Sequence, residues 1–211
     1  MSSPKSPVEP TYADRVYRSL GGIIGGTLLL GLITWLAIDA IVRGAGRTPW
    51  FAVAAVLLVV PLVVALSLRP AVLVSDDRVL VRNPFRTVNL PWGAIEDFRA
   101  GYSSEVWTKA GAKFQLWAVP VSLRQRNRAA RRRERQGQAK AGRANSVGTQ
   151  LPDHGSQLAP ADQTISDLRG LIEHNAGRPT AQGEPRVRWA FELIIPAVIG
   201  AVLMIVLFAI G

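Results

Sequence analysis

Two pairs of adjacent carboxylates are the residues in this 211-residue chain that could do acid–base chemistry: Asp76 with Asp77, and Glu96 with Asp97. Two carboxyl groups in one site can act as a general acid and a general base. Neighbours on a strand, however, point to opposite faces, and acids in turns usually accept hydrogen bonds from the turn backbone. Neither pair is therefore expected to form a catalytic dyad.

The chain also lacks the partners that other reactions need. Ser103 and Ser104 have no histidine close by in the sequence to activate them, and His154 and His174 lie in polar surroundings. The absence of cysteine excludes disulfides and thiolate metal sites. No phosphate-binding glycine loop, HExxH motif or nucleophile elbow is present. We therefore predict no enzymatic activity, no cofactor and no metal site.

A run of basic residues is the strongest charge feature, since residues 124–143 hold nine basic residues and one acid. Its first seven arginines are candidates for contact with lipid or phosphate: Arg124, Arg126, Arg128, Arg131, Arg132, Arg133 and Arg135. The run is consistent with a solvated insertion or with attraction to anionic lipid headgroups. Nucleic acid is disfavoured as a partner, because no aromatic residue is interleaved to stack on bases.

Three stretches are apolar enough to be membrane helices: residues 20–42, 49–68 and 189–211. Each approaches or exceeds the roughly 18 to 20 apolar residues that cross about 30 Å of hydrocarbon as a helix. The first is longer than a signal-peptide core of about 7 to 15 residues, and no clear cleavage site follows it. We predict an integral membrane protein with three transmembrane helices.

Lys and Arg predict the orientation, because short cationic flanks are rarely translocated. Residues 69–188 contain 20 Lys and Arg against 11 Asp and Glu, a net of +9, whereas residues 43–48 contain two basic residues. We therefore predict a multi-pass plasma-membrane protein. Its tail, residues 1–19, and its soluble domain would be cytoplasmic, with residues 43–48 and the C-terminus outside.

Four glycines in the first predicted helix form two overlapping small-xxx-small pairs: Gly21, Gly22, Gly25 and Gly26. Such pairs let another helix approach closely. They fit packing within a helical hairpin and self-association equally well, so a homo-oligomer stays open.

After Ala71 the sequence changes to short alternating segments separated by turn residues. Alternation of apolar and polar residues with period two is typical of half-buried strands. The strand candidates are residues 71–75, 78–83, 86–92, 95–101, 104–109 and 113–119, with a last short candidate at 121–123. Six or seven antiparallel strands at this spacing predict a small barrel or two packed sheets.

One helix signal follows the strands, at residues 164–175. One helical face carries Ile165, Leu168, Leu171 and Ile172, and Thr164 with Asp167 has the spacing of a capping box. An amphipathic helix at this place can cover an open end of a barrel.

The stretch "LVSDDRVLVRNPFRTVNLPWGAIEDF", residues 73–98, resembles the PH-like domains of actinobacterial membrane proteins related to low molecular weight protein antigen 6. The residues that carry the resemblance are Val79, Val81, Arg82, Pro91, Trp92 and Ile95. It implies a pleckstrin-homology-like fold in which the C-terminal helix caps a bent seven-strand barrel. It does not imply phosphoinositide binding.

The predicted fold class is therefore an α+β membrane protein: three transmembrane helices plus a PH-like antiparallel barrel or two-sheet domain capped by one amphipathic helix. The domain would occupy residues 69–177 with a disordered Arg-rich insertion at 124–160, and residues 178–188 would be a linker. Loop-closure entropy rises slowly with length, so such an insertion is tolerable.

Without a catalytic constellation, we expect a non-catalytic interaction or scaffold module for a protein partner or the membrane surface. Two alternatives stay open. One is an electrostatic sensor of anionic lipids that acts through the Arg-rich insertion, and the other is an accessory subunit of a larger membrane complex.

Overall fold

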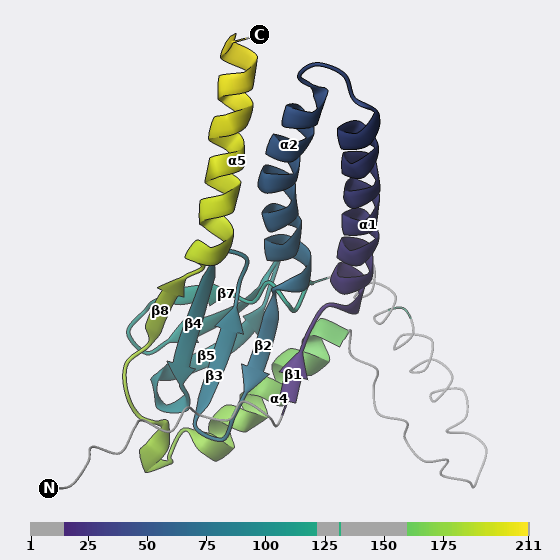
Figure 1. Ribbon diagram of the computed structural model, residues 1–211. Helices are drawn as coiled ribbons and strands as arrows, with labels where there is room; N and C mark the ends of the chain where they lie inside the picture. Colours follow the sequence, from purple (N-terminus) through teal and green to yellow (C-terminus); the bar gives the residue numbers. More distant parts are fainter. Residues whose placement is uncertain (1–14, 122–130, 132–159, 211) are drawn as a thin grey trace, which may run out of the picture.

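The computed structural model describes residues 15–121, 131 and 160–210, and shows a layer of three long helices standing on a strand-rich domain (Figure 1). Of the Arg-rich stretch predicted as an insertion, Arg131 and Pro160 are described and the rest lies outside the described residues. The fold is α+β, as predicted.

The helical layer consists of α1 (Leu20–Arg43), α2 (Thr48–Val63), which continues into the π-helix η1 (Val64–Leu68), and α5 (Phe191–Ile210). All three segments, α2 and η1 being one, are long and apolar enough to cross a membrane. The Ser19 hydroxyl accepts from the Gly22 amide at 3.2 Å and so caps the start of α1. Proline in the first turn of α2 explains why that helix begins there.

α2 lies between α1 and α5 (Figure 1). Glycines permit both close approaches: a Cβ added to Gly26 would lie 2.5 Å from the Cβ of Ser67 in η1, and one added to Gly200 in α5 would overlap the backbone of Leu57 and Leu58. Gly22 also faces η1, whereas a Cβ on Gly21 or Gly25 would meet nothing within 4 Å.

The strands form two antiparallel sheets. Sheet A has the order β1-β2-β3-β4-β8, and sheet B has the order β5-β6-β7. The bounds are β1 Arg15–Tyr17, β2 Ala71–Val74, β3 Arg78–Arg82, β4 Arg86–Pro91, β5 Ile95–Ala100, β6 Ser104–Thr108, β7 Lys113–Gln115 and β8 Arg186–Trp189. Of the two arrangements expected, the described strands form two sheets and no closed barrel.

Both edge strands of sheet A come from segments that were predicted to have no strand. β1 lies in the predicted tail and pairs with β2, and β8 lies in the predicted linker and pairs with β4. Segments of three or four residues that begin with arginine give no strand signal alone, because the pairing partner supplies the stability. β7 is shorter than the candidate at residues 113–119, because the chain turns after Gln115, where the Val119 amide donates to the Leu116 carbonyl.

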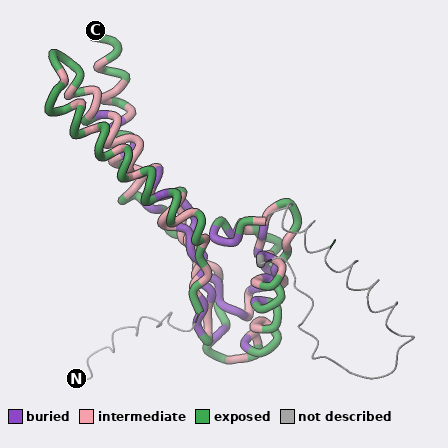
Figure 2. Tube along the Cα trace, turned by 90° about the vertical axis from the view of Figure 1, so that its right-hand side faces the viewer, coloured by how far each residue is buried: buried purple, intermediate pink, exposed green. Residues whose placement is uncertain are grey.

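The domain core lies between the sheets and α4 (Pro160–Asn175). Its largest fully buried side chains are Trp92, Phe98, Leu90, Ile95, Leu116 and Leu168. Ile165 and Leu168 turn the apolar face of α4 into this core, as the predicted amphipathic pattern requires. Figure 2 shows buried residues concentrated in the domain, whereas α1 and α5 are largely exposed or intermediate.

Candidate functional site

Three strands of sheet A join the apolar helices at one end of the domain, which we call the helix end (Figure 1). Two residues separate β1 from α1, two separate η1 from β2, and one separates β8 from α5. The opposite end, marked by the turn at residues 75–77 between β2 and β3, is called the far end. Such short connections hold the helix end directly beside the helices.

Arg69, in the connection from η1 to β2, fastens three elements at the helix end. Its Nη1 lies 2.6 Å from Oε1 of Glu192 at the start of α5, and its Nη2 donates to Oγ1 of Thr87 in β4 at 3.1 Å. The Arg69 side chain is 17% exposed, and its Nε has no hydrogen-bond partner among the described residues. Arg69 therefore sets how the second and third helices sit on sheet A.

Five further residues lie at the same end of the domain, and we call them the helix-end rim: Arg82, Arg86, Trp117, Arg188 and Trp189. Arg82 ends β3 and Arg86 begins β4, so the two flank one turn. In the register of β4 with β8, Arg188 pairs with Thr87 and Trp189 with Arg86. Trp117 lies at the same turn, because its amide donates to Oδ1 of Asn83 at 3.2 Å.

At the far end, each acid of the first predicted pair is bound to a different partner. Asp76 lies 3.0 Å from Nη1 of Arg178, and Asp77 accepts from the Thr180 hydroxyl at 2.6 Å. The indole of Trp92 donates to the Ser75 carbonyl at 2.9 Å, which closes the same turn from the core side. These carboxylates hold the segment that follows α4 onto the β2–β3 turn.

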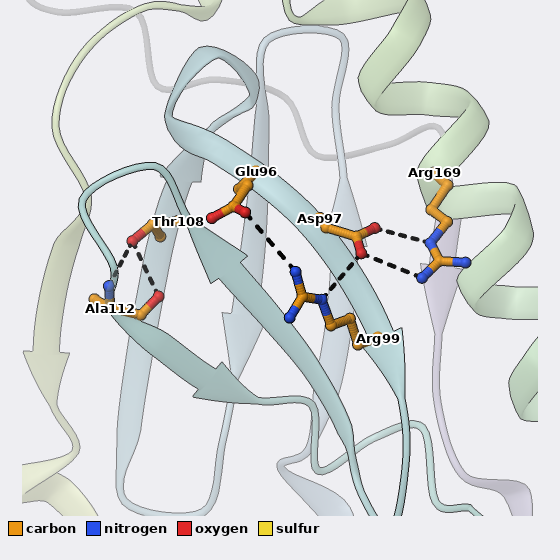
Figure 3. A network of polar contacts seen from close by, with 6 residues as sticks. All are labelled: Glu96, Asp97, Arg99, Thr108, Ala112 and Arg169. Atoms are coloured by element: carbon orange, nitrogen blue, oxygen red, sulfur yellow. Dashed lines mark hydrogen bonds and ion pairs between the residues drawn. The ribbon is translucent and has the colours of Figure 1, made fainter.

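Asp97, of the second acidic pair, fastens α4 to sheet B (Figure 3). Arg169 of α4 binds both carboxylate oxygens of Asp97, at 2.8 and 3.3 Å, and Arg99 donates to Asp97 at 3.1 Å and lies 3.8 Å from Glu96. Burial alone would raise the pKa of Asp97, but the hydrogen bonds from Arg169 and Arg99 outweigh it and hold the pKa below its ordinary value. Asp97 is thus an ionised anchor at neutral pH.

The two serine hydroxyls have no histidine partner among the described contacts. Ser103 donates to Glu105 at 2.9 Å, and the buried Ser104 Oγ has no hydrogen-bond partner among the described residues. No cluster of His, Asp and Glu that could hold a metal ion occurs in the described part of the chain. The described side chains of the helix-end rim are instead charged and aromatic, and such side chains are suited to binding.

The predicted motif residues divide between core and helix end. Val79, Val81 and Trp92 are fully buried, Ile95 and Pro91 are buried with them, and Arg82 belongs to the rim. Among the seven candidate arginines, Arg131 is described as an exposed helical residue and the other six lie outside the described residues.

Sequence reasoning missed Arg69, Arg86, Arg188 and the role of Glu192. For Arg69 and Arg188 a signal was present, since an arginine stands within three residues of the domain-side end of every apolar helix, whereas Arg86 had none. The sequence does not show which of these arginines forms an ion pair, because the partners lie far apart in the chain. Arg69 and Glu192, for example, are 123 positions apart.

Residues 69–178 match the bacterial PH domain family, which is just over half of the chain. The protein therefore belongs to the bacterial PH domain family, as the resemblance at residues 73–98 indicated. No curated protein and no solved structure shows a significant match to the chain. Strands β1 and β8 and all three long helices lie outside the matched region.

Proposed function

We propose that this protein crosses the plasma membrane three times and holds its PH-like domain against the cytoplasmic face. There the domain is a non-catalytic interaction module for a protein partner or the membrane surface. The observation that carries the proposal is the shared exit of all three apolar helices from one end of the domain, through connections of one or two residues.

The helix surfaces support insertion into lipid. Leu28 and Trp35 of α1 and Ile205 and Phe208 of α5 are among many large apolar side chains that stay exposed along the described helices. Contiguous apolar surface on this scale is rare on soluble monomers and is ordinary for helices in lipid.

The charges at the helix ends support the orientation. On the domain side, Arg18, Arg69 and Arg188 stand next to the three helices, whereas on the other side Arg43 pairs with Asp39 of α1 at 3.1 Å. Residues 43–48 hold two basic residues, Arg43 and Arg47, against 20 in residues 69–188. By the positive-inside rule, this asymmetry supports a cytoplasmic domain.

Labelling of single cysteines tests the proposal, since the chain has none of its own. Ala45→Cys places a thiol between α1 and α2, and Lys109→Cys places one at the far end, where the Lys109 amide donates to the Ala94 carbonyl. An impermeant maleimide should label Ala45→Cys on intact cells and Lys109→Cys only after permeabilisation. The reverse pattern, or loss of the chain from membranes in a carbonate wash, would contradict the proposal.

The arginine run supports a second candidate function, an electrostatic sensor of anionic lipids. Nine basic residues against one acid within 20 positions is a density that attracts anionic membranes, at up to about 1 kcal/mol for each basic residue at the surface. Deleting residues 124–143 tests this role. Binding of anionic lipid that is unchanged by the deletion removes the insertion as its source.

A further inference from the structure

We propose that the helix-end rim is a binding surface for the headgroups of anionic phospholipids of the protein's own membrane. The inference rests on the proposed function, because it needs the helices to be inserted. It assigns lipid contact to Arg82, Arg86 and Arg188, which are folded residues of the domain, and not to the arginine run.

The charges of the rim are available for an external anion. Arg82, Arg86 and Arg188 form no ion pair within the part of the chain that the structure describes. Glu192, in the first turn of α5, is bound directly by Arg69, and Arg188 acts on it only through a weaker charge attraction without an ion pair. Guanidinium groups match the geometry of phosphate oxygens and can bind them through two parallel hydrogen bonds.

The aromatic residues of the rim fit the same partner. Trp189 is 58% exposed and Trp117 is 44% exposed, although both are large apolar side chains. Tryptophan prefers the interface between headgroups and hydrocarbon, where its ring is dry and its N–H is wet. The Arg86 guanidinium of β4 lies 5.6 Å from the centre of the Phe114 ring of β7, a cation–π contact between the two sheets that leaves its N–H groups without an ion-pair partner among the described residues.

The height of the rim relative to the helices also favours headgroups over a soluble ligand. The Ala190 amide, one residue before α5, donates to the Phe85 carbonyl at 2.9 Å, so the turn between Arg82 and Arg86 lies level with the first residues of α5. Helix starts of this kind lie at the polar boundary of the bilayer. Headgroup phosphates are therefore the anions that the rim meets first.

Spin-labelled lipids in nanodiscs provide the test. The full-length protein is reconstituted in phosphatidylcholine nanodiscs containing a trace of spin-labelled phosphatidylglycerol or of spin-labelled phosphatidylcholine, and the motionally restricted fraction of each lipid gives its relative association with the protein. Co-elution of protein with the discs is checked first, so that a failure of insertion, which would contradict the proposed function, is seen separately.

We expect phosphatidylglycerol to be preferred, and the triple variant Arg82→Gln, Arg86→Gln, Arg188→Gln to lose most of that preference. An upper bound is roughly fivefold for each arginine removed, which is the factor equivalent to about 1 kcal/mol. The matched control removes three basic residues near the far end, Arg15→Gln, Arg78→Gln and Lys109→Gln, and should keep the preference. Equal association of both lipids with the wild type, or a preference that survives in the rim variant, would overturn the inference. A preference lost only on deletion of residues 124–143 would overturn it too.

Discussion

Three acids away from the helix end each bind a partner from another segment, and we call these the anchoring acids of the far half: Asp76, Asp77 and Asp97. At the helix end, by contrast, no ion pair among the described residues is formed by Arg82, Arg86 or Arg188. Both regions are built on the strands of one small domain. The difference is in what the charges do.

The anchoring acids of the far half hold α4 and the segment after it onto the sheets. Arg178, Arg169 and Thr180 belong to α4 or to the segment after it, and their acidic partners belong to the sheets. At the helix end Arg69 alone among the arginines considered does comparable work, because it joins the second and third helices through Glu192. Charge count alone therefore does not separate the arginines that hold the fold together from those that have no ion pair among the described residues.

The largest expected effect comes from the far-end turn. Trp92→Ala removes a fully buried indole that donates to Ser75 and packs edge-on against Phe98, so we expect a loss of about 3 to 5 kcal/mol in the free energy of unfolding. Thermal unfolding in detergent micelles, followed by circular dichroism, measures it. Trp117→Ala, at a half-exposed position of the rim, is the control and should cost about 1 kcal/mol or less. An equal loss of unfolding free energy in both variants would contradict the view that the far-end tryptophan is part of the core and the rim tryptophan is not.

Arg69→Gln should have the next largest effect, about 1 to 2 kcal/mol, because it removes hydrogen bonds to Glu192 and Thr87 from a mostly buried side chain. The same unfolding measurement applies, with the exposed Arg18→Gln as a control expected to change little. An Arg69 variant as stable as the control would show that the clamp does not hold the helices on the sheet.

Asp97→Asn should cost about 0.5 to 1 kcal/mol at neutral pH, the range for partly exposed ion pairs. The pKa of Asp97 is lowered in the folded state, so its contribution is complete above the unfolded value of about 3.9 and is lost as pH falls through the folded pKa. The stability difference between wild type and variant should thus stay constant from pH 7 to 5 and shrink below about pH 4. A difference that grows on acidification would mean that the sign of the shift is wrong.

The smallest effect is expected at the rim. Neutralising Arg82, Arg86 and Arg188 together removes three charges without an intramolecular ion pair in the described chain, so the free energy of unfolding should change by about 0.5 kcal/mol or less. The change in unfolding free energy of this rim variant is compared with that of Asp97→Asn, measured under the same conditions. A loss of more than about 2 kcal/mol in the rim variant would show that these arginines are structural, like the acids of the far half.

The sequence predicted the parts of the fold that composition and period determine. The three apolar segments, the strands from residue 71 to residue 108 and the amphipathic face of α4 all follow from patterns local to each element. β1 and β8 were missed because three- and four-residue edge strands exist only through their pairing with β2 and β4. The Arg69 clamp was missed because Arg69 meets its two partners, Glu192 and Thr87, only in the folded chain.

The central claim is that the helix end of the domain faces the bilayer. Its most direct test places one fluorophore on Gln115→Cys, whose backbone carbonyl accepts from Asn83 at the helix end, or on Lys109→Cys at the far end, and measures quenching by lipids that carry a nitroxide on the headgroup. The account predicts strong quenching of the probe at residue 115 and little at residue 109 when the full-length protein is in nanodiscs. Equal quenching, or stronger quenching at residue 109, would contradict it.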